Sequence, residues 1–224
     1  MKSGNLYIVA TPIGNLKDIT FRAIETFKQV DLIVCEDTRQ TRKLLDHYKI
    51  KKQVLSFHQH SNEKKLQSLI DKLKKGQGIA YVSDAGTPNV SDPGGKLVEL
   101  AFNEGIKTIP IPGPSALTTL ISVSGIPMDE FSFLGFIPHK KGRQKFLKKI
   151  QESKVPVVFF ESKHRIKKTL VALSDLIPER NIIIGRELTK MFETIYKGNV
   201  KTINTEFEST GNLKGEFVII INNK

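Results

Sequence analysis

Residues 79–95 read IAYVSDAGTPNVSDPGG and contain the transition that decides the fold. The run Ile79–Val82 is apolar and rich in residues that favour strands, which predicts a short buried strand. The residues that follow are small, polar or turn-forming, as expected for a loop. A helix over 93–103 is predicted because Asp92 suits an N-cap and Gly105 lies just past the end. The stretch is therefore a strand, an elaborate loop and a helix.

The loop of this stretch has the composition of a ligand site. In an open parallel sheet, ligands bind beyond the carboxyl ends of the strands, and Asp84 follows such an end. Its carboxylate is suited to hydroxyl groups of a ribose or to an ammonium group, and Gly86, without a Cβ, lets a ligand approach the backbone. Two turns that combine aspartate and glycine favour a small-molecule pocket over a purely structural pair of capped turns. The glycine-rich loops of dinucleotide and nucleoside triphosphate sites are not found here.

Strands and helices alternate along the rest of the chain, which argues for βα units and a largely parallel sheet. Further strands are expected at Leu6–Ala10, Asp31–Cys35, Val54–Phe57, Ile106–Ile111, Phe131–Ile137, Val155–Phe160, Asn181–Leu188 and Glu216–Ile221. The pattern restarts after Gly125-Ile126-Pro127. Two α/β domains are therefore predicted, over residues 1–116 and 117–224, with the ligand loop at 83–95 in the first.

The composition indicates a globular protein of a reducing compartment. The chain has 224 residues, 39% of them hydrophobic, which is enough for a sizeable core. Cys35 is the only cysteine, so no intramolecular disulfide and no cysteine metal cluster can form within one chain, and no spacing of His, Asp and Cys suggests a metal. The N-terminus lacks the flanks of a signal peptide, and no apolar run reaches membrane-spanning length. We expect a cytoplasmic protein without membrane segments.

The charge suggests a polyanionic partner. The formal net charge is +12, and residues 139–149 carry six lysines or arginines and no acid. Such an excess is typical of proteins that bind nucleic acid. A lysine-rich genome bias is the alternative for the total charge, and a solvated helix face is the alternative for the basic run.

Two other junctions between strand and helix carry candidate functional groups. The first, Glu36-Asp37-Thr38-Arg39, combines two acids that favour the positive end of a helix with an arginine able to fork onto a phosphate. The second, Pro112-Gly113-Pro114-Ser115-Ala116, precedes a helix whose first N–H groups are free to hold an anion or a polar ligand atom. A stiff corner between domains is the structural alternative for the second.

These junctions belong to a set of motifs that resembles a known family. In chain order the motifs are LYIVATPIGNL (6–16), CEDTR (35–39), VSDAGTP (82–88), SDPG (91–94), PGPSA (112–116) and FLGF (133–136). Together they closely resemble the ribosomal RNA small-subunit methyltransferase I family, which lies within the tetrapyrrole-methylase-like superfamily. The resemblance runs from about residue 5 to at least residue 198.

The resemblance implies a fold and an activity. The fold is two α/β domains of the tetrapyrrole-methylase type with the active-site cleft between them, usually in a homodimer. The activity is S-adenosylmethionine-dependent methylation of the 2′-oxygen of a cytidine in the decoding region of 16S rRNA. The implied partners are the cofactor S-adenosylmethionine and the small ribosomal subunit, in the cytoplasm.

The resemblance also suggests roles for individual residues. Candidates for the chemistry or for binding the substrate phosphate are Glu36, Asp37, Arg39 and Lys163. Candidates for binding the cofactor are Asp84, Gly86, Thr87, Ser115, Ala116, Phe160, Leu188 and Thr189. For Phe160, Leu188 and Thr189 the structural alternative is a core strand followed by a cap. Candidates for binding RNA are Arg39, Lys140, Lys141, Arg143 and Lys145.

Two rival interpretations keep the fold and change the role. A tetrapyrrole methylase would take a small substrate, and the basic run at 140–149 together with the motifs at 11–16 and 35–39 argues against it. A ribosome-assembly factor without catalysis would need no intact cofactor loop, and the loop at Asp84 argues against that.

Overall fold

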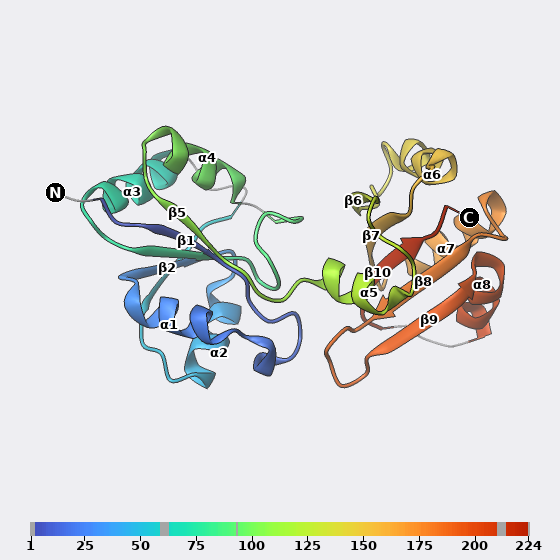
Figure 1. Cartoon of the computed structure of the whole chain (residues 1–224), viewed down its shortest axis with the longest axis horizontal. Coiled ribbons are helices and arrows are strands. Elements are labelled where there is room, and N and C mark those ends of the chain that lie inside the picture. Colours follow the sequence, from blue (N-terminus) through green and yellow to red (C-terminus); the bar gives the residue numbers. More distant parts are fainter. Residues whose placement is uncertain (1–2, 59–62, 93, 210–213, 224) are drawn as a thin grey trace. The chain divides into compact units, whose positions relative to one another are not determined.

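The computed structural model describes residues 3–58, 63–92, 94–209 and 214–223. The chain divides into two compact units, an N-terminal unit of residues 1–115 and a C-terminal unit of residues 116–224. A five-stranded sheet with flanking helices forms the framework of each unit (Figure 1). No helix within the described ranges is long and apolar enough to cross a lipid bilayer.

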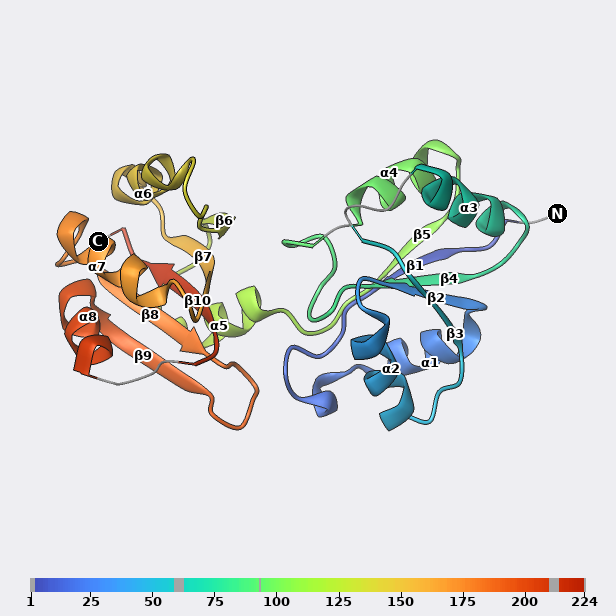
Figure 2. The same cartoon turned by 180° about the vertical axis from the view of Figure 1, so that it is seen from behind.

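The sheet of the N-terminal unit is entirely parallel. Its strands are β1 (Leu6–Val9), β2 (Leu32–Cys35), β3 (Gln53–Ser56), β4 (Ile79–Val82) and β5 (Thr108–Ile111). They are arranged in the order β3-β2-β4-β1-β5, with β3 at the edge beside β2 (Figure 2). The predicted strand at 79–82 is confirmed, and it lies in the centre of the sheet.

Helices cover both faces of this sheet. They are α1 (Phe21–Gln29), α2 (Thr38–His47), α3 (Glu63–Lys74) and α4 (Gly95–Asn103), with a short 3₁₀ helix, η1 (Leu16–Asp18). α1 and α2 lie on one face and α3 and α4 on the other (Figure 1). Because side chains of a strand alternate between faces, Ile79 and Tyr81 pack with α3 and α4, whereas Ala80 and Val82 pack with α1 and α2. Burial on both faces explains why β4 is continuously apolar.

The start of α4 differs from the prediction. The helix begins at Gly95, and its N-cap is Gly94 rather than Asp92; residue 93 lies outside the described residues. Gly94 has φ +141°, and a Cβ at this position would lie 2.4 Å from the ring of Tyr81. Glycine is therefore required at the junction, since a side chain would collide with the buried tyrosine.

The sheet of the C-terminal unit is mostly antiparallel, so the prediction of a largely parallel sheet is wrong for this unit. Its strands are β6 (Ser132–Phe136), β7 (Val157–Ser162), β8 (Asn181–Arg186), β9 (Thr194–Asn199) and β10 (Glu216–Ile221), in the order β6-β7-β10-β8-β9. Only β6 and β7 pair in parallel. Alternation of strands and helices continues here, but β8 and β9 form a hairpin and β10 inserts between β7 and β8.

A large hydrophobic core covers one face of this sheet. The helices are α5 (Ala116–Ser124), α6 (Arg143–Glu152), α7 (Ile166–Leu176) and α8 (Val200–Ser209). α6, α7 and α8 pack in the core with alternate residues of β7, β8 and β10. α5 contacts β8 and β10, where Leu120 lies against Gly185. Neither β9 nor α8 was predicted from the sequence. In the case of β9 the reason is that it is an edge strand without a continuous apolar run.

A buried polar network links α6, α7 and β7. The side chain of Glu161 is fully buried and forms an ion pair with Arg165 at 2.9 Å. The Thr169 hydroxyl donates to the other carboxylate oxygen of Glu161 at 2.7 Å, and Arg143 donates to the same hydroxyl oxygen at 3.2 Å. Arg165 also donates to the backbone carbonyl of Ile137 at 2.6 Å. The network therefore attaches the start of α6 and the end of β6 to the centre of the unit.

Candidate functional site

Polar loops gather at one edge of the N-terminal sheet. β2, β4 and β1 are neighbours and parallel, so their carboxyl ends lie at the same edge. Glu36 and Asp37 follow β2, Ser83 and Asp84 follow β4, and Thr11 lies two residues after β1. Motifs far apart in the sequence therefore meet at the edge where ligands bind in sheets of this type.

Asp37 links the loop after β2 to the loop after β4. Its backbone N–H donates to Oδ1 of Asp84 at 2.9 Å. Its carboxylate caps α2 by accepting from the backbone N–H of Arg39 at 2.8 Å, and it also accepts from the Arg39 guanidinium at 2.6 Å. The hydrogen bonds from Arg39 hold the pKa of Asp37 at about 2, and Asp37 in turn raises the pKa of Arg39. Arg39 is thus both highly exposed, at 85% of its side chain, and engaged with Asp37.

Two further carboxyl groups at this edge are harder to ionise. Burial raises the pKa of Glu36, and the negative charges of Asp84, Asp92 and Asp37 raise it further. Burial and the charge of Asp84 likewise raise the pKa of Asp92, against a hydrogen bond with Ser83 that lowers it. The edge therefore concentrates negative charge, which favours a cationic or hydroxyl-rich ligand.

Hydrogen bonds hold the loop 83–87 in place. Thr11 and Gly86 exchange two backbone hydrogen bonds of 2.9 Å each, and the Thr87 hydroxyl donates to the carbonyl of Pro114 at 3.1 Å. Gly86 has φ +77°, and a Cβ there would lie 3.3 Å from Ile13. The predicted ligand loop is thus attached to the loops that follow β1 and β5.

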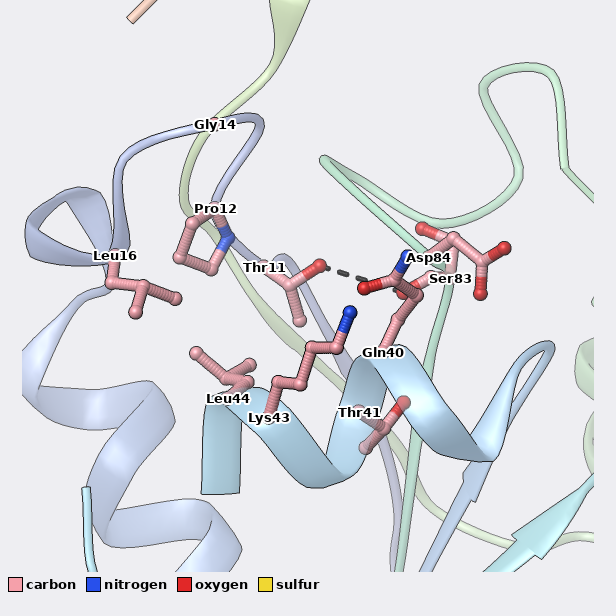
Figure 3. Close-up of a pocket in the computed structure, with 10 residues that line it drawn as sticks. All are labelled: Thr11, Pro12, Gly14, Leu16, Gln40, Thr41, Lys43, Leu44, Ser83 and Asp84. Carbon is pink, nitrogen blue, oxygen red and sulfur yellow. Dashed lines mark hydrogen bonds between the residues drawn. The ribbon is translucent and has the colours of Figure 1, made fainter. Parts of the chain in front are cut away.

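A pocket of about 240 Å³ opens beside this loop (Figure 3). Its lining residues come from the loop after β1, from α2 and from the end of β4: Thr11, Pro12, Gly14, Leu16, Gln40, Thr41, Lys43, Leu44, Ser83 and Asp84. Pro12, Leu16 and Leu44 form an apolar wall, and the side chains of Gln40 and Lys43 extend from α2 toward Thr11 and Ser83 (Figure 3). We name this hollow the α2 pocket.

Sequence reasoning missed Gln40 and Lys43. The available signal was their position: they lie three residues apart on one face of a helix that begins directly after Glu36 and Asp37. Because the adjacent motif CEDTR contains Arg39, that residue was predicted to bind phosphate instead.

Three predicted cofactor residues lie in or just after the strands of the C-terminal unit. Phe160 is half-buried in β7 and packs edge-to-face against Phe133 and Phe136. Leu188 is buried, and Thr189 follows it in the connection between β8 and β9 with φ +65°. The Thr189 hydroxyl oxygen is buried and has no hydrogen-bond partner within the described residues, so it can accept or donate to a ligand. The remaining two, Ser115 and Ala116, adjoin the start of α5 as predicted.

The basic residues separate into surface and interior groups. Lys140, Lys141 and Lys145 are exposed around the start of α6, and Lys163 is exposed in the turn before α7. Arg143 is only 9% exposed, and its guanidinium donates to Thr169 and to the carbonyl of Lys168. The prediction that Arg143 contacts RNA is therefore withdrawn, since its charge serves the interior of the unit. No group of three or more metal-ligating side chains occurs in the parts of the chain that the structure describes.

Comparison with known proteins identifies the class. A family model described as Tetrapyrrole (Corrin/Porphyrin) Methylases matches residues 5–204. The structure of a diphthine synthase aligns over 99% of this chain and 90% of that chain with a TM-score of 0.77 and 15% identity. A cobalt precorrin-4 methyltransferase aligns over 97% and 94% of the two chains with a TM-score of 0.71 and 18% identity. At these identities the structures establish a shared fold: that of the tetrapyrrole methylases.

Relatives in sequence narrow the class to one family. "Ribosomal RNA small subunit methyltransferase I" of Halalkalibacterium halodurans is 47% identical over 220 residues, covering 97% of this chain and 75% of the relative. The protein of the same name from Thermotoga maritima is 44% identical over 221 residues, covering 99% of both chains. The chain therefore belongs to the ribosomal RNA small subunit methyltransferase I family, and the predicted fold and family are confirmed.

Proposed function

We propose that this protein is an S-adenosylmethionine-dependent methyltransferase that methylates the 2′-oxygen of a cytidine in the decoding region of 16S rRNA. The observation that carries the proposal is 47% identity, over nearly the whole chain, to a relative named as a small-subunit rRNA methyltransferase. The geometry of the carboxyl edge, where the Asp84 loop meets Glu36 and Asp37, supports it. A cytoplasmic homodimer acting on the small ribosomal subunit is part of the same proposal, and analytical ultracentrifugation tests the dimer.

The residues present fit the proposed cofactor. Asp84 is exposed, and its carboxyl oxygens can accept hydrogen bonds from a ribose diol or an ammonium. The buried Thr189 hydroxyl lacks a partner among the described residues, as expected for a group that a ligand completes. Gly86 and Thr87 shape the loop, Ser115 and Ala116 lie at a helix start, and Phe160 and Leu188 offer apolar surface. We assign these residues to cofactor binding.

The transfer breaks a carbon–sulfur bond and forms a carbon–oxygen bond, and the hydroxyl proton must leave. S-adenosylmethionine supplies an activated methyl group on a sulfonium, so much of the protein's contribution is alignment of donor and acceptor. Glu36 is the better proton acceptor of the two acids after β2, because its pKa is raised whereas that of Asp37 is held at about 2. Arg39 and Lys163 are assigned to substrate phosphate, and Lys140, Lys141 and Lys145 to RNA at the surface of α6.

Incubation with labelled cofactor tests the proposed activity. Purified protein should label small ribosomal subunits that lack the modification, and mapping of ribose methylation should locate the label on one cytidine. A precorrin serves as the alternative substrate, because the fold is shared with tetrapyrrole methylases. Labelling of the precorrin alone would favour the small-molecule function, and cofactor binding without any transfer would favour an assembly factor.

Cofactor binding should not require a metal ion. Titration of the protein with S-adenosylmethionine in the presence of a chelator should give heat by calorimetry, since the proposed contacts are carboxylate, hydroxyl and backbone groups. Absence of heat at high protein concentration would contradict the assignment of the Asp84 loop.

The exposed lysines before α6 should contribute to RNA affinity through phosphate contacts. Lys140→Ala with Lys141→Ala is expected to weaken RNA binding and to flatten the log–log dependence of affinity on salt by up to about 1.5–2 units, since each phosphate contact releases counterions. Lys167→Ala with Lys168→Ala is the matched control, because this pair is also adjacent and exposed in the C-terminal unit. An unchanged slope in the first variant, with its circular dichroism intact, would assign Lys140 and Lys141 to solvent.

A further inference from the structure

We propose that the α2 pocket receives the base of the cytidine to be methylated, with Gln40 on the polar edge of the base and Lys43 on the adjacent phosphate. The inference rests on the proposed function and extends it, because it assigns the base of the substrate to a binding pocket in the N-terminal unit. It follows from the size of the pocket, from the free polar groups that line it and from its position beside Asp84.

The pocket has the size and walls of a site for one small ring. Its volume of about 240 Å³ is below the roughly 300–1,000 Å³ of sites for drug-sized ligands, so a single base fits better than a whole cofactor. Pro12, Leu16 and Leu44 provide an apolar surface for the faces of the ring, and Thr11 and Ser83 lie at the opposite side (Figure 3). A base that is flipped out of the RNA stack is bound by apolar contacts to its faces and by hydrogen bonds to its pairing edge.

Gln40 and Lys43 carry the polar groups that would bind a nucleotide. A carboxamide offers both an acceptor and donors, which matches the amino group and ring nitrogen on the pairing edge of cytosine. An ammonium offers donors and a positive charge, which suits a phosphate. Neither side chain makes a hydrogen bond or ion pair with another group in the described part of the chain, so both are free for a ligand. By contrast, Thr11 and Thr41 use their hydroxyls on the backbone carbonyls of Ser83 and Asp37.

The position of the pocket suits the acceptor of a methyl group. Asp84, assigned to the cofactor, also lines the pocket, and Asp37 bonds to its carboxylate at 2.9 Å. A base bound in the pocket would therefore place its own ribose close to the loop that contains Asp84. Such closeness is what the reaction requires, because transfer proceeds from reactants held at about 3–3.5 Å.

The rival occupant is the methionine end of the cofactor, whose carboxylate would pair with Lys43. The two occupants are distinguished by replacing Gln40 and Lys43 with methionine, which keeps length and helix propensity and removes the polar group. Arg42→Met is the matched control, since Arg42 is the neighbouring exposed cation on α2 and does not line the pocket. Each full-length variant is measured for S-adenosylmethionine affinity, for kcat/KM on unmethylated small subunits and for the salt dependence of subunit binding.

The expected result is a loss confined to the RNA substrate. Gln40→Met should lower kcat/KM about tenfold and Lys43→Met about ten- to hundredfold, because a neutral and a charge-assisted hydrogen bond are lost. Lys43→Met should also flatten the log–log salt slope by about 0.7–0.9, and Gln40→Met should leave it unchanged. S-adenosylmethionine affinity should stay within about twofold of the parent in all variants, and Arg42→Met should match the parent in each measurement.

Two results would overturn the inference. If Lys43→Met weakens S-adenosylmethionine binding tenfold or more, the pocket belongs to the cofactor. If Gln40→Met and Lys43→Met methylate subunits like a parent that is itself active, the base binds elsewhere and the proposed function stands. A parent that binds cofactor but leaves the subunits unmethylated would overturn the proposed function itself, so the two failures are distinguishable.

Discussion

Replacing Asp84 with alanine is expected to weaken S-adenosylmethionine binding about ten- to hundredfold and to abolish methylation at ordinary cofactor concentrations. A hydrogen bond to a charged group contributes about 1.5–3 kcal/mol, which corresponds to that loss in affinity. Because Asp84 is exposed and accepts one hydrogen bond within the described residues, from the N–H of Asp37, the effect on folding should be small. Calorimetric titration measures the affinity directly.

Two further variants distinguish the effect of the Asp84 charge from that of the hydrogen bond it accepts and from that of a neighbouring acid. Asp84→Asn keeps an acceptor for the N–H of Asp37 and removes the charge, so it should lose cofactor affinity while the loop stays attached. Asp92→Asn removes a charge from the same cluster without touching a group assigned to the cofactor. In both Asp84 variants the pKa of Glu36 should fall toward its ordinary value, since Asp84 helps to raise it. Cofactor binding as tight as in the parent would show that Asp84 has another role.

Glu161→Ala should destabilise the C-terminal unit by about 3–5 kcal/mol, because it leaves the charge of Arg165 without its buried partner. The same change removes the acceptor of the Thr169 hydroxyl and one partner of the Ser162 N–H. Unfolding in denaturant, followed by a probe in the C-terminal unit, measures the loss. Cofactor affinity of the folded variant is measured alongside, so that stability and function are not confused.

A double-mutant cycle isolates the pair itself. Arg165→Ala alone should also destabilise the unit, and the double variant should lose less than the sum of the single losses, because neither charge is then left alone. Glu152→Ala is the control: its ion pair with Lys148 is exposed, at 64% and 69% of the side chains, so the expected loss is below about 1 kcal/mol. If Glu161→Ala is as mild as Glu152→Ala, the network is not a structural support.

The N-terminal unit was predictable because its signals are local. Each buried strand is a short apolar run, and each is followed by small or polar residues at the carboxyl edge, as Ile79–Val82 is followed by Asp84. In a parallel sheet all such ends lie at one edge, so the topology brings Glu36, Asp37 and Asp84 together once the strands are recognised.

The C-terminal unit was harder to predict because its pairing is not local. Its elements also alternate, yet β10 at the end of the chain pairs antiparallel with both β7 and β8. The edge strand β9 carries no continuous apolar run, so the sequence pattern does not indicate its hairpin with β8. Arg143 is similar: within a run of exposed lysines it looked like a surface cation, and only its bond to Thr169, 26 residues later, shows that it is buried.

By itself the sequence determined the family, the strands of the N-terminal sheet and the polar loops that follow them, because apolar runs, turn residues and long motifs are properties of neighbouring residues. The tertiary structure decided which side chains are free to act. Arg143 is held inside the C-terminal unit, whereas Gln40 and Lys43 face a pocket. These outcomes depend on contacts between segments distant along the chain, such as the hydrogen bond between Asp37 and Asp84, which lie 47 positions apart. Such contacts exist only after the sheets have formed.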